Sequence, residues 1–174
     1  MLKIRFKYLS VFLALITLLS FLNILYSYYF NLYLNLNTYF YTLLISGFVS
    51  LIFFKLKSSE KRPSLFEKIL TILFGYIIIP LILTIPFYFS IYNLTFLNAL
   101  FESVSGFTST GFSIFNDIKQ IDQSLIMWRS TTQWIGGLYF LFSIIFLIDI
   151  YDESLKRSLT NFISLNNSEI IKQS

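Results

Sequence analysis

The sequence predicts an all-α integral membrane protein with four transmembrane helices and one short re-entrant helix that leads into a loop. Of its 174 residues, 56% are hydrophobic and only 13% are charged, and the mean hydropathy is +0.70. A soluble domain of this size needs more charge to cover its surface. Long stretches without charge alternate with short segments that collect Lys and Arg, as expected of membrane spans and their connections.

The first uncharged stretch runs from Tyr8 to Phe54, which is long enough for two membrane helices of about 20 residues each. Three asparagines within residues 31–37 mark a turn between them. We therefore expect transmembrane helices over about residues 8–30 and 38–55, which form an N-terminal pair within residues 1–57.

Residues 58–68 are rich in charge and are predicted to form a cytoplasmic loop, and residues 69–150 are predicted to form a helix–loop–helix unit. Within this unit, a second uncharged stretch predicts a helix over about residues 69–92 and a turn at Asn93. Residues 94–113 are too short, and too polar at their end, to cross the bilayer. We therefore expect them to be a re-entrant segment.

The last transmembrane helix is expected over about residues 127–150, followed by a polar tail, residues 151–174, that is loose at its end. The basic residues give the orientation, because cytoplasmic connections are enriched in Lys and Arg. Eleven of the 13 basic residues lie before the first helix, between the second and third, or after the fourth. A multi-pass protein of the plasma (inner) membrane with both termini in the cytoplasm is therefore expected, and the re-entrant segment enters from outside.

The composition argues against several classes of function. The chain has no Cys and no His, which removes disulfides, thiolate metal sites and the usual hydrolytic triads and zinc sites. The net charge of +4 comes from basic residues at the ends of the spans, so it does not suggest a nucleic-acid partner. We expect no enzymatic activity and no cofactor, and a lipid bilayer as the surroundings.

The most informative stretch is Ser105–Ser113, S-G-F-T-S-T-G-F-S. A dehydrated K⁺ needs oxygen ligands, and backbone carbonyls supply them when a short extended segment points them inward. Thr108–Phe112 meets this need, because Gly accepts unusual conformations and small hydroxyls add oxygens without bulk. Residues 96–105 predict a pore helix, whose C-terminal end favours a cation through its partial negative charge. Apolar residues recur along one face of this helix: Leu97, Leu100, Phe101 and Val104.

Two motifs together resemble one known family. Ala99-Leu-Phe-Glu-Ser-Val-Ser-Gly-Phe-Thr-Ser-Thr-Gly111 is followed by Ser124-Leu-Ile-Met-Trp-Arg-Ser-Thr-Thr-Gln-Trp-Ile-Gly-Gly137, and the combination is similar to the Trk/Ktr/HKT family of potassium-uptake proteins. The resemblance implies a selectivity-filter loop that transports K⁺ without a cofactor. The matching filter residues are Thr108, Ser109, Thr110, Gly111 and Phe112. It further implies that K⁺ binds the backbone carbonyls of the first four, and that Gly111 goes with K⁺ permeation.

Four further residues are expected to support the filter: Glu102, Ser105, Gly106 and Arg129. Glu102 either braces the filter and concentrates cations or makes a structural hydrogen bond to loop N–H groups. Arg129 either anchors the loop by pairing with Glu102, Asp117 or Asp122, or extends its charge to the membrane interface. Gly136 and Gly137 are expected to allow close helix approach.

The family is built from four helix–loop–helix units whose loops meet in one pore, and this sequence holds one such unit. We therefore expect the remaining three pore repeats to come from another chain or from identical copies. The resemblance also implies a cytoplasmic nucleotide-binding regulatory subunit. A truncated or split member is the favoured interpretation. A homotetrameric cation channel, a non-conducting remnant and a small membrane scaffold or interaction protein are the alternatives.

Overall fold

A computed structural model describes residues 6–56, 64–115 and 121–172, with side chains described as far as residue 147. The chain divides into two compact units, Met1–Phe140 and Leu141–Ser174. Its helices are α1 (Phe6–Tyr29), α2 (Leu36–Lys55), α3 (Leu65–Leu83), α4 (Ile85–Tyr88), α5 (Phe96–Phe107) and α6 (Gln123–Lys172). The described residues contain no strand, as the all-α prediction requires.

Among the described residues, four helical segments are long and apolar enough to cross a membrane: Phe6–Tyr29, Leu36–Lys55, Leu65–Tyr88 and Gln123–Leu147. This confirms the predicted number of transmembrane helices. Helix α5 has 12 residues and is therefore only about 18 Å long at 1.5 Å per residue. It is too short to cross a hydrocarbon core of about 30 Å.

The third span begins earlier than residue 69, the start expected from the uncharged stretch. Helix α3 starts at Leu65 because the side chain of Ser64 caps it, accepting a hydrogen bond from the backbone N–H of Glu67 at 3.3 Å. The span is also interrupted at Thr84, between α3 and α4, with Pro86 at the start of α4. A proline near a helix start fits this position, because it needs no N–H partner there.

The last helix also differs from its expected bounds. It starts at Gln123 instead of residue 127 and continues as far as Lys172, where the sequence predicts a loose end of the tail. The charged segment 57–63 and the residues Asp117 and Lys119 lie outside the described part of the chain, and so do the side chains beyond residue 147.

Helices α1 and α2 pack against each other through small hydroxyl side chains. Hydroxyl groups of described residues bond across this interface: Thr17 Oγ1 with Ser46 Oγ at 2.8 Å, Ser20 Oγ to the Tyr39 carbonyl at 2.7 Å, and Ser50 Oγ to the Ser10 carbonyl at 2.8 Å. Small residues let helix backbones approach closely in a membrane, where apolar burial drives no association. The pair is therefore held by neutral polar contacts.

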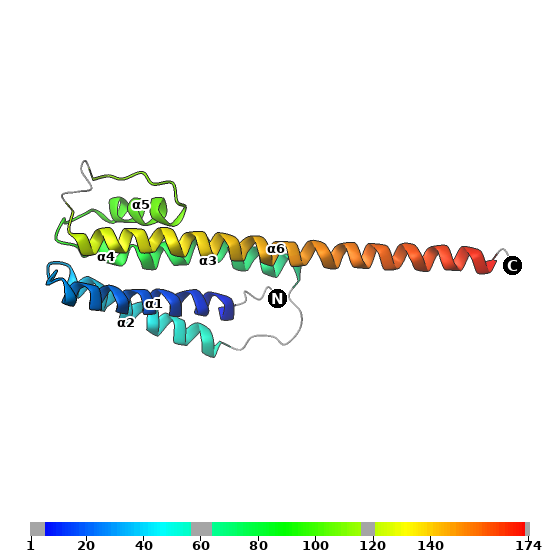
Figure 1. Cartoon of the computed structure of the whole chain (residues 1–174). Coiled ribbons are helices and arrows are strands. Elements are labelled where there is room, and N and C mark those ends of the chain that lie inside the picture. The colour runs from blue at the N-terminus through cyan, green and yellow to red at the C-terminus, as the bar shows by residue number, and fades with distance from the viewer. Residues whose placement is uncertain (1–5, 57–63, 116–120, 173–174) are drawn as a thin grey trace. The chain divides into compact units, whose positions relative to one another are not determined.

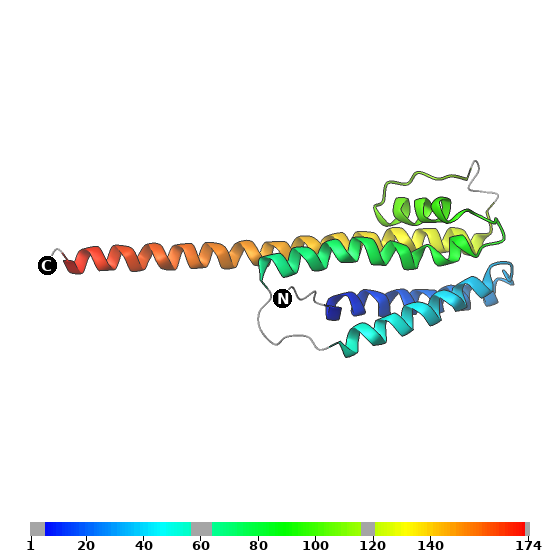
Figure 2. The same ribbon diagram turned by 180° about the vertical axis from the view of Figure 1, so that it is seen from behind.

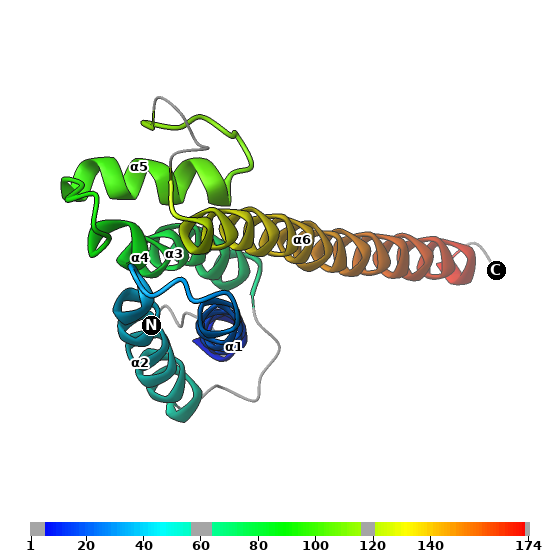
Figure 3. The same cartoon turned by 60° about the vertical axis from the view of Figure 1, so that its left-hand side comes forward.

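Within the first unit, α3 and the N-terminal part of α6 lie between the α1–α2 pair and α5, as the views from opposite sides show (Figures 1 and 2). The same order is visible after a further rotation (Figure 3). Two buried aromatic side chains join the middle layer: Trp128 Nε1 donates to the Leu83 carbonyl at 3.2 Å, and the Tyr139 hydroxyl donates to the Ile72 carbonyl at 3.0 Å. Helix α5 and the loop after it thus lie against one face of α3 and α6.

Candidate ion-binding loop

Helix α5 starts from a capped turn and buries its polar face. The side chain of Thr95 accepts a hydrogen bond from the Asn98 N–H at 3.3 Å, which fixes the first turn. Glu102, Ser103, Ser105 and Gly106 are buried, whereas Leu97, Phe101 and Val104 are exposed. Three of the four residues of the predicted apolar face thus lie on the surface of the first unit, and the fourth, Leu100, is half-buried.

The loop folds back onto the end of α5. The N–H groups of Ser109, Thr110 and Gly111 donate to carbonyls of Gly106 and Ser105 at 2.9, 3.0 and 3.4 Å. Ser109 and Gly111 have φ values of 56° and 84°, in the left-handed region. Thr108 has right-handed helical backbone angles and is followed by the left-handed Ser109, a combination that directs successive N–H groups to one side. These N–H groups therefore point at α5.

The carbonyl groups of this segment, unlike its N–H groups, mostly lack hydrogen-bond partners among the described residues. No described residue donates a hydrogen bond to the carbonyls of Thr108, Ser109 or Thr110, and all three residues are exposed. The Gly111 carbonyl accepts one bond from Arg129 and keeps a second lone pair. Gly111 is itself open to its surroundings, since a Cβ added there would meet nothing within 4 Å.

Arg129 of α6 holds the end of the loop. Its Nη2 donates to the carbonyls of Gly111 and Phe112, at 3.0 Å each. The same Phe112 carbonyl accepts a hydrogen bond from Ser105 Oγ at 2.6 Å. The Phe112 side chain, in contrast, is 70% exposed. Arg129 thus fixes the backbone of the loop and leaves its aromatic side chain outside.

A buried carboxylate completes this arrangement. Glu102 is fully buried, and its Oε1 accepts hydrogen bonds from Ser113 Oγ at 2.8 Å and from the Ile114 N–H at 2.6 Å. Its Oε2 lies 3.5 Å from Arg129 Nε, an ionic contact without hydrogen-bond geometry. Glu102 is one of the three partners predicted for Arg129 from the sequence.

Two glycines bring α5 and α6 into close contact. A Cβ on Gly106 would collide with Thr132 Oγ1, and a Cβ on Gly136 would collide with the backbone of Phe107. Nothing lies within 4 Å of a Cβ added to Gly137. The expected close approach of the two helices therefore depends on Gly136 and not on its neighbour.

Several residues of this arrangement are missing from the sequence prediction. Ser113 and Ile114 donate to Glu102, Thr132 faces Gly106, and Ser103 Oγ donates to the Pro80 carbonyl at 2.6 Å. Ser113 does close the Ser/Thr-rich stretch, which was a usable signal. Ser103, buried on the polar face of α5, could have been found by asking which face of a membrane helix carries its polar residues.

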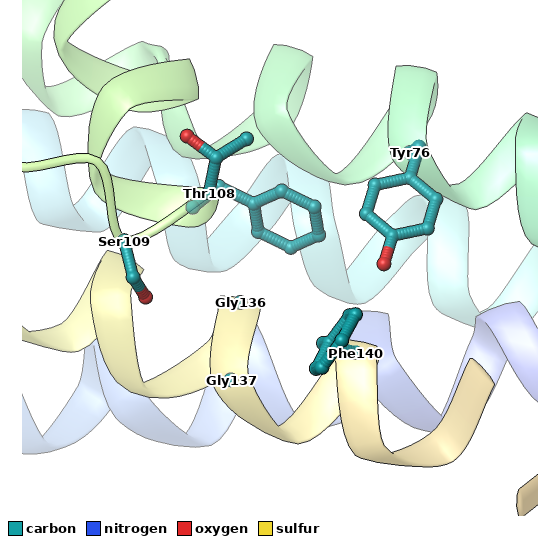
Figure 4. Close-up of a pocket in the computed structure, with 7 residues that line it drawn as sticks. Tyr76, Thr108, Ser109, Gly136, Gly137 and Phe140 are labelled. Carbon is teal, nitrogen blue, oxygen red and sulfur yellow. The ribbon is translucent and has the colours of Figure 1, made fainter. Parts of the chain in front are cut away.

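A cavity of about 400 Å³ adjoins the start of the loop. Figure 4 shows Thr108 and Ser109 at one end of it and Tyr76 and Phe140 at the other, with Gly136 and Gly137 along one wall. The loop thus has open space beside its first two residues.

Comparisons with known proteins agree with the motifs. A family model described as TrkH, cation transport protein, matches residues 34–169. An uncharacterized cation transporter of Methanocaldococcus jannaschii is 32% identical over 110 residues, which is 62% of this chain. The Trk system potassium uptake protein TrkG of Escherichia coli strain K12 is 46% identical over 46 residues, and TrkI of Halomonas elongata is 40% identical over 60.

The aligned segments cover 26% and 34% of this chain for TrkG and TrkI. They cover 23%, 10% and 11% of the lengths of the M. jannaschii, E. coli and H. elongata relatives, so the chain spans less than a quarter of each. The family model, however, matches most of this chain, including α5, the loop and the start of α6. With its four apolar spans, the chain is a multi-pass membrane protein that belongs to the TrkH family of cation transport proteins.

Proposed function

We propose that this chain supplies one pore-loop unit of a potassium-uptake system, in which α5 is a re-entrant pore helix and the following loop lines the path of K⁺. The observation that carries the proposal is the backbone of Thr108–Thr110. Its three carbonyls accept no hydrogen bond from described residues, while the neighbouring N–H groups bond to α5. Unpaired carbonyls at membrane depth are tolerated where they line a water-filled path, and such carbonyls replace the hydration shell of K⁺.

The contacts of α5 support the same role. The helix and its loop begin and end at the same end of the span bundle, because the backbone N–H of Asp122 donates to the Tyr92 hydroxyl at 2.7 Å. A short helix that returns on the side where it started is re-entrant once the spans cross a bilayer. The C-terminal end of α5 then points toward the membrane interior, where its partial negative charge favours a cation.

One loop supplies only part of a ring of carbonyls. We propose that three further pore repeats, from another chain or from identical copies, complete it around the exposed residues Thr108–Gly111. Longer relatives with potassium-uptake names support this assembly. On the resemblance alone we also propose a cytoplasmic nucleotide-binding regulatory subunit, and K⁺ as cargo with no cofactor.

The membrane setting follows from the spans. Exposed apolar side chains on α2 and α3 suit contact with lipid: Leu44, Phe48, Phe54, Leu73 and Ile77. The distribution of Lys and Arg supports a plasma-membrane orientation with cytoplasmic termini. The outer side is then the side from which the loop enters.

The test is Gly111→Ser, with Gly47→Ser as its matched control. Gly111 has φ +84°, so a side chain strains the backbone without any collision. Gly47 lies on α2, and a Cβ there would meet nothing closer than Thr17 at 3.4 Å. A left-handed conformation costs a non-glycine residue about 1–2 kcal/mol, which corresponds to roughly a tenfold change in an equilibrium.

K⁺ and Na⁺ uptake are measured in cells that lack their own potassium-uptake systems and that express this chain with its complementary units. We expect Gly111→Ser to lower the ratio of K⁺ to Na⁺ uptake about tenfold, and Gly47→Ser to leave it unchanged. An unchanged ratio in Gly111→Ser contradicts the filter and favours a membrane scaffold. The mass of the solubilised complex separates identical copies from a second chain.

A further inference from the structure

The turn between α1 and α2 contains one buried asparagine that reaches the part of the chain holding the loop. Asn35 is 1% exposed. Its Oδ1 accepts a hydrogen bond from the Ile91 N–H at 3.0 Å, and its Nδ2 donates to Asp122 Oδ2 at 3.1 Å. A backbone N–H can only donate and a carboxylate can only accept, so this amide orientation is the one that satisfies both neighbours.

The two partners of Asn35 are the two ends of the segment that carries the loop. Ile91 precedes α5, and Asp122 precedes α6. The ends are also joined directly, by the hydrogen bond from the Asp122 N–H to the Tyr92 hydroxyl. Asn35 lies in the turn of the N-terminal helix pair, and it therefore links the two ends of the segment although it is not part of that segment.

Further contacts tie both N-terminal helices to the start of α6. Ser124 Oγ donates to Asp122 Oδ2 and lies 2.9 Å from the Tyr39 hydroxyl of α2. Asn23 Nδ2 of α1 donates to the Ser124 carbonyl at 3.4 Å. The start of α6 is thus fixed by α1, by α2 and by the turn between them.

The position of α6 matters to the loop because α6 carries Arg129. Asp122 and Arg129 are seven residues apart, about 10 Å along a helix. Arg129 holds the carbonyls of Gly111 and Phe112. A shift of the start of α6 relative to Ile91 would therefore move the guanidinium of Arg129 relative to α5 and Glu102.

We propose that Asn35 is a positioning residue for ion selectivity: it sets the spacing between α5 and α6, and the N-terminal helix pair is thereby part of the selectivity apparatus. The inference rests on the proposed function, since it assumes that the loop selects the ion. It assigns a role to α1 and α2 beyond anchoring the chain in the membrane.

An exchange of the two side chains tests the proposal. Asn35→Asp places a second carboxylate beside Asp122, which accepts the present hydrogen bond. The two negative charges then repel each other. Asp122→Asn keeps an acceptor for Asn35 and Ser124.

In the double variant, the new amide at position 122 donates to the new carboxylate at position 35, which still accepts from the Ile91 N–H. The Ser124 hydroxyl then accepts from that amide while it donates to Tyr39. Asn37→Asp is the matched control, since Asn37 lies two residues away and is exposed.

Two readouts separate this inference from the proposed function. The chain has no Cys, so spin labels on Leu97→Cys of α5 and Ser130→Cys of α6, both exposed positions, report the α5–α6 distance in the full chain. The second readout is the ratio of K⁺ to Na⁺ uptake in the cells described above, with the complementary units present and without spin labels.

We expect Asn35→Asp to broaden and shift the distance distribution and to lower the uptake ratio about tenfold, in line with coupling within one hydrogen-bond network. The double variant restores both, and Asn37→Asp changes neither. If Asn35→Asp does not fold but the double variant does, the pairing is supported.

An unchanged distance or uptake ratio in Asn35→Asp overturns the inference, and so does a double variant that fails to restore them. If the parent chain transports no K⁺ but the distances respond as expected, the proposed function fails while the placement of α5 by Asn35 stands.

Discussion

Two regions of the first unit hold their helices together in opposite ways. The α1–α2 interface uses neutral hydrogen bonds from hydroxyl side chains of Thr17, Ser20 and Ser50. The contact between α5, its loop and α6 uses the buried ion pair of Glu102 and Arg129, whose remaining atoms bind the loop. Regular helices satisfy their own backbone groups, whereas an irregular loop does not. Charge is thus placed where the backbone itself is irregular.

This difference predicts a large effect at Arg129. Arg129→Gln leaves the carboxylate of Glu102 buried without its counter-charge and removes the Nη2 group that donates to the carbonyls of Gly111 and Phe112. Breaking a buried pair from one side costs about 3–5 kcal/mol. We expect a loss of that size in the free energy of unfolding, measured in detergent with a chemical denaturant.

The double variant Glu102→Gln, Arg129→Gln is the control for this experiment. It removes both charges together, so it should recover part of the stability that Arg129→Gln loses. The free energy of unfolding of Arg129→Gln could instead lie within about 1 kcal/mol of the parent value, which is the range of an exposed pair. In that case the loop is held by other contacts, and the contrast between the two regions disappears.

A smaller effect is expected where α5 and α6 touch. Gly136→Ala places a methyl group against the backbone of Phe107, whereas Gly137→Ala places the same group in open space. Overpacking a close contact costs about 1–3 kcal/mol. Thermal unfolding should therefore show Gly136→Ala melting below Gly137→Ala, and Gly137→Ala melting no lower than the parent, because Ala is the better helix former. Equal melting temperatures for the two variants would mean that α5 can move away from α6 without loss of stability.

The smallest effect is expected in the N-terminal pair. Thr17→Val and Ser46→Ala each remove one side of the hydroxyl contact between α1 and α2. Neutral interhelical hydrogen bonds in membrane proteins contribute about 0.6 kcal/mol on average. A double-mutant cycle on the unfolding free energy should give a coupling of that size. A coupling above about 2 kcal/mol would place this interface on a level with the charged one and remove the distinction.

Composition and charge placement were enough to predict the four spans, because a membrane helix needs only a long apolar stretch. Its ends depend on caps, and this is where the prediction failed. The distribution of charge predicts that the third span begins after Lys68, yet Ser64 caps α3 through the N–H of Glu67. The pattern Ser-x-x-Glu at these positions is a known start signal and was available in the sequence.

The candidate loop could be located from its glycines and hydroxyls, but its supports could only partly be named. Glu102 and Arg129 stood out because charges in an apolar segment need partners. Asn35 did not stand out, because its two partners lie 56 and 87 positions further along the chain. A turn asparagine has a local explanation, and only the folded arrangement shows that this one serves a distant segment.

The contact between Tyr92 and Asp122 has a consequence for how such units can diverge. Because the two ends of residues 93–121 are fastened to each other, the length of that segment is independent of the spacing between the neighbouring spans. Doubling the length of a flexible loop adds only about 0.6 kcal/mol of closure entropy. Repeated units of this kind can therefore acquire different loops by insertion or deletion while their membrane helices keep one common frame.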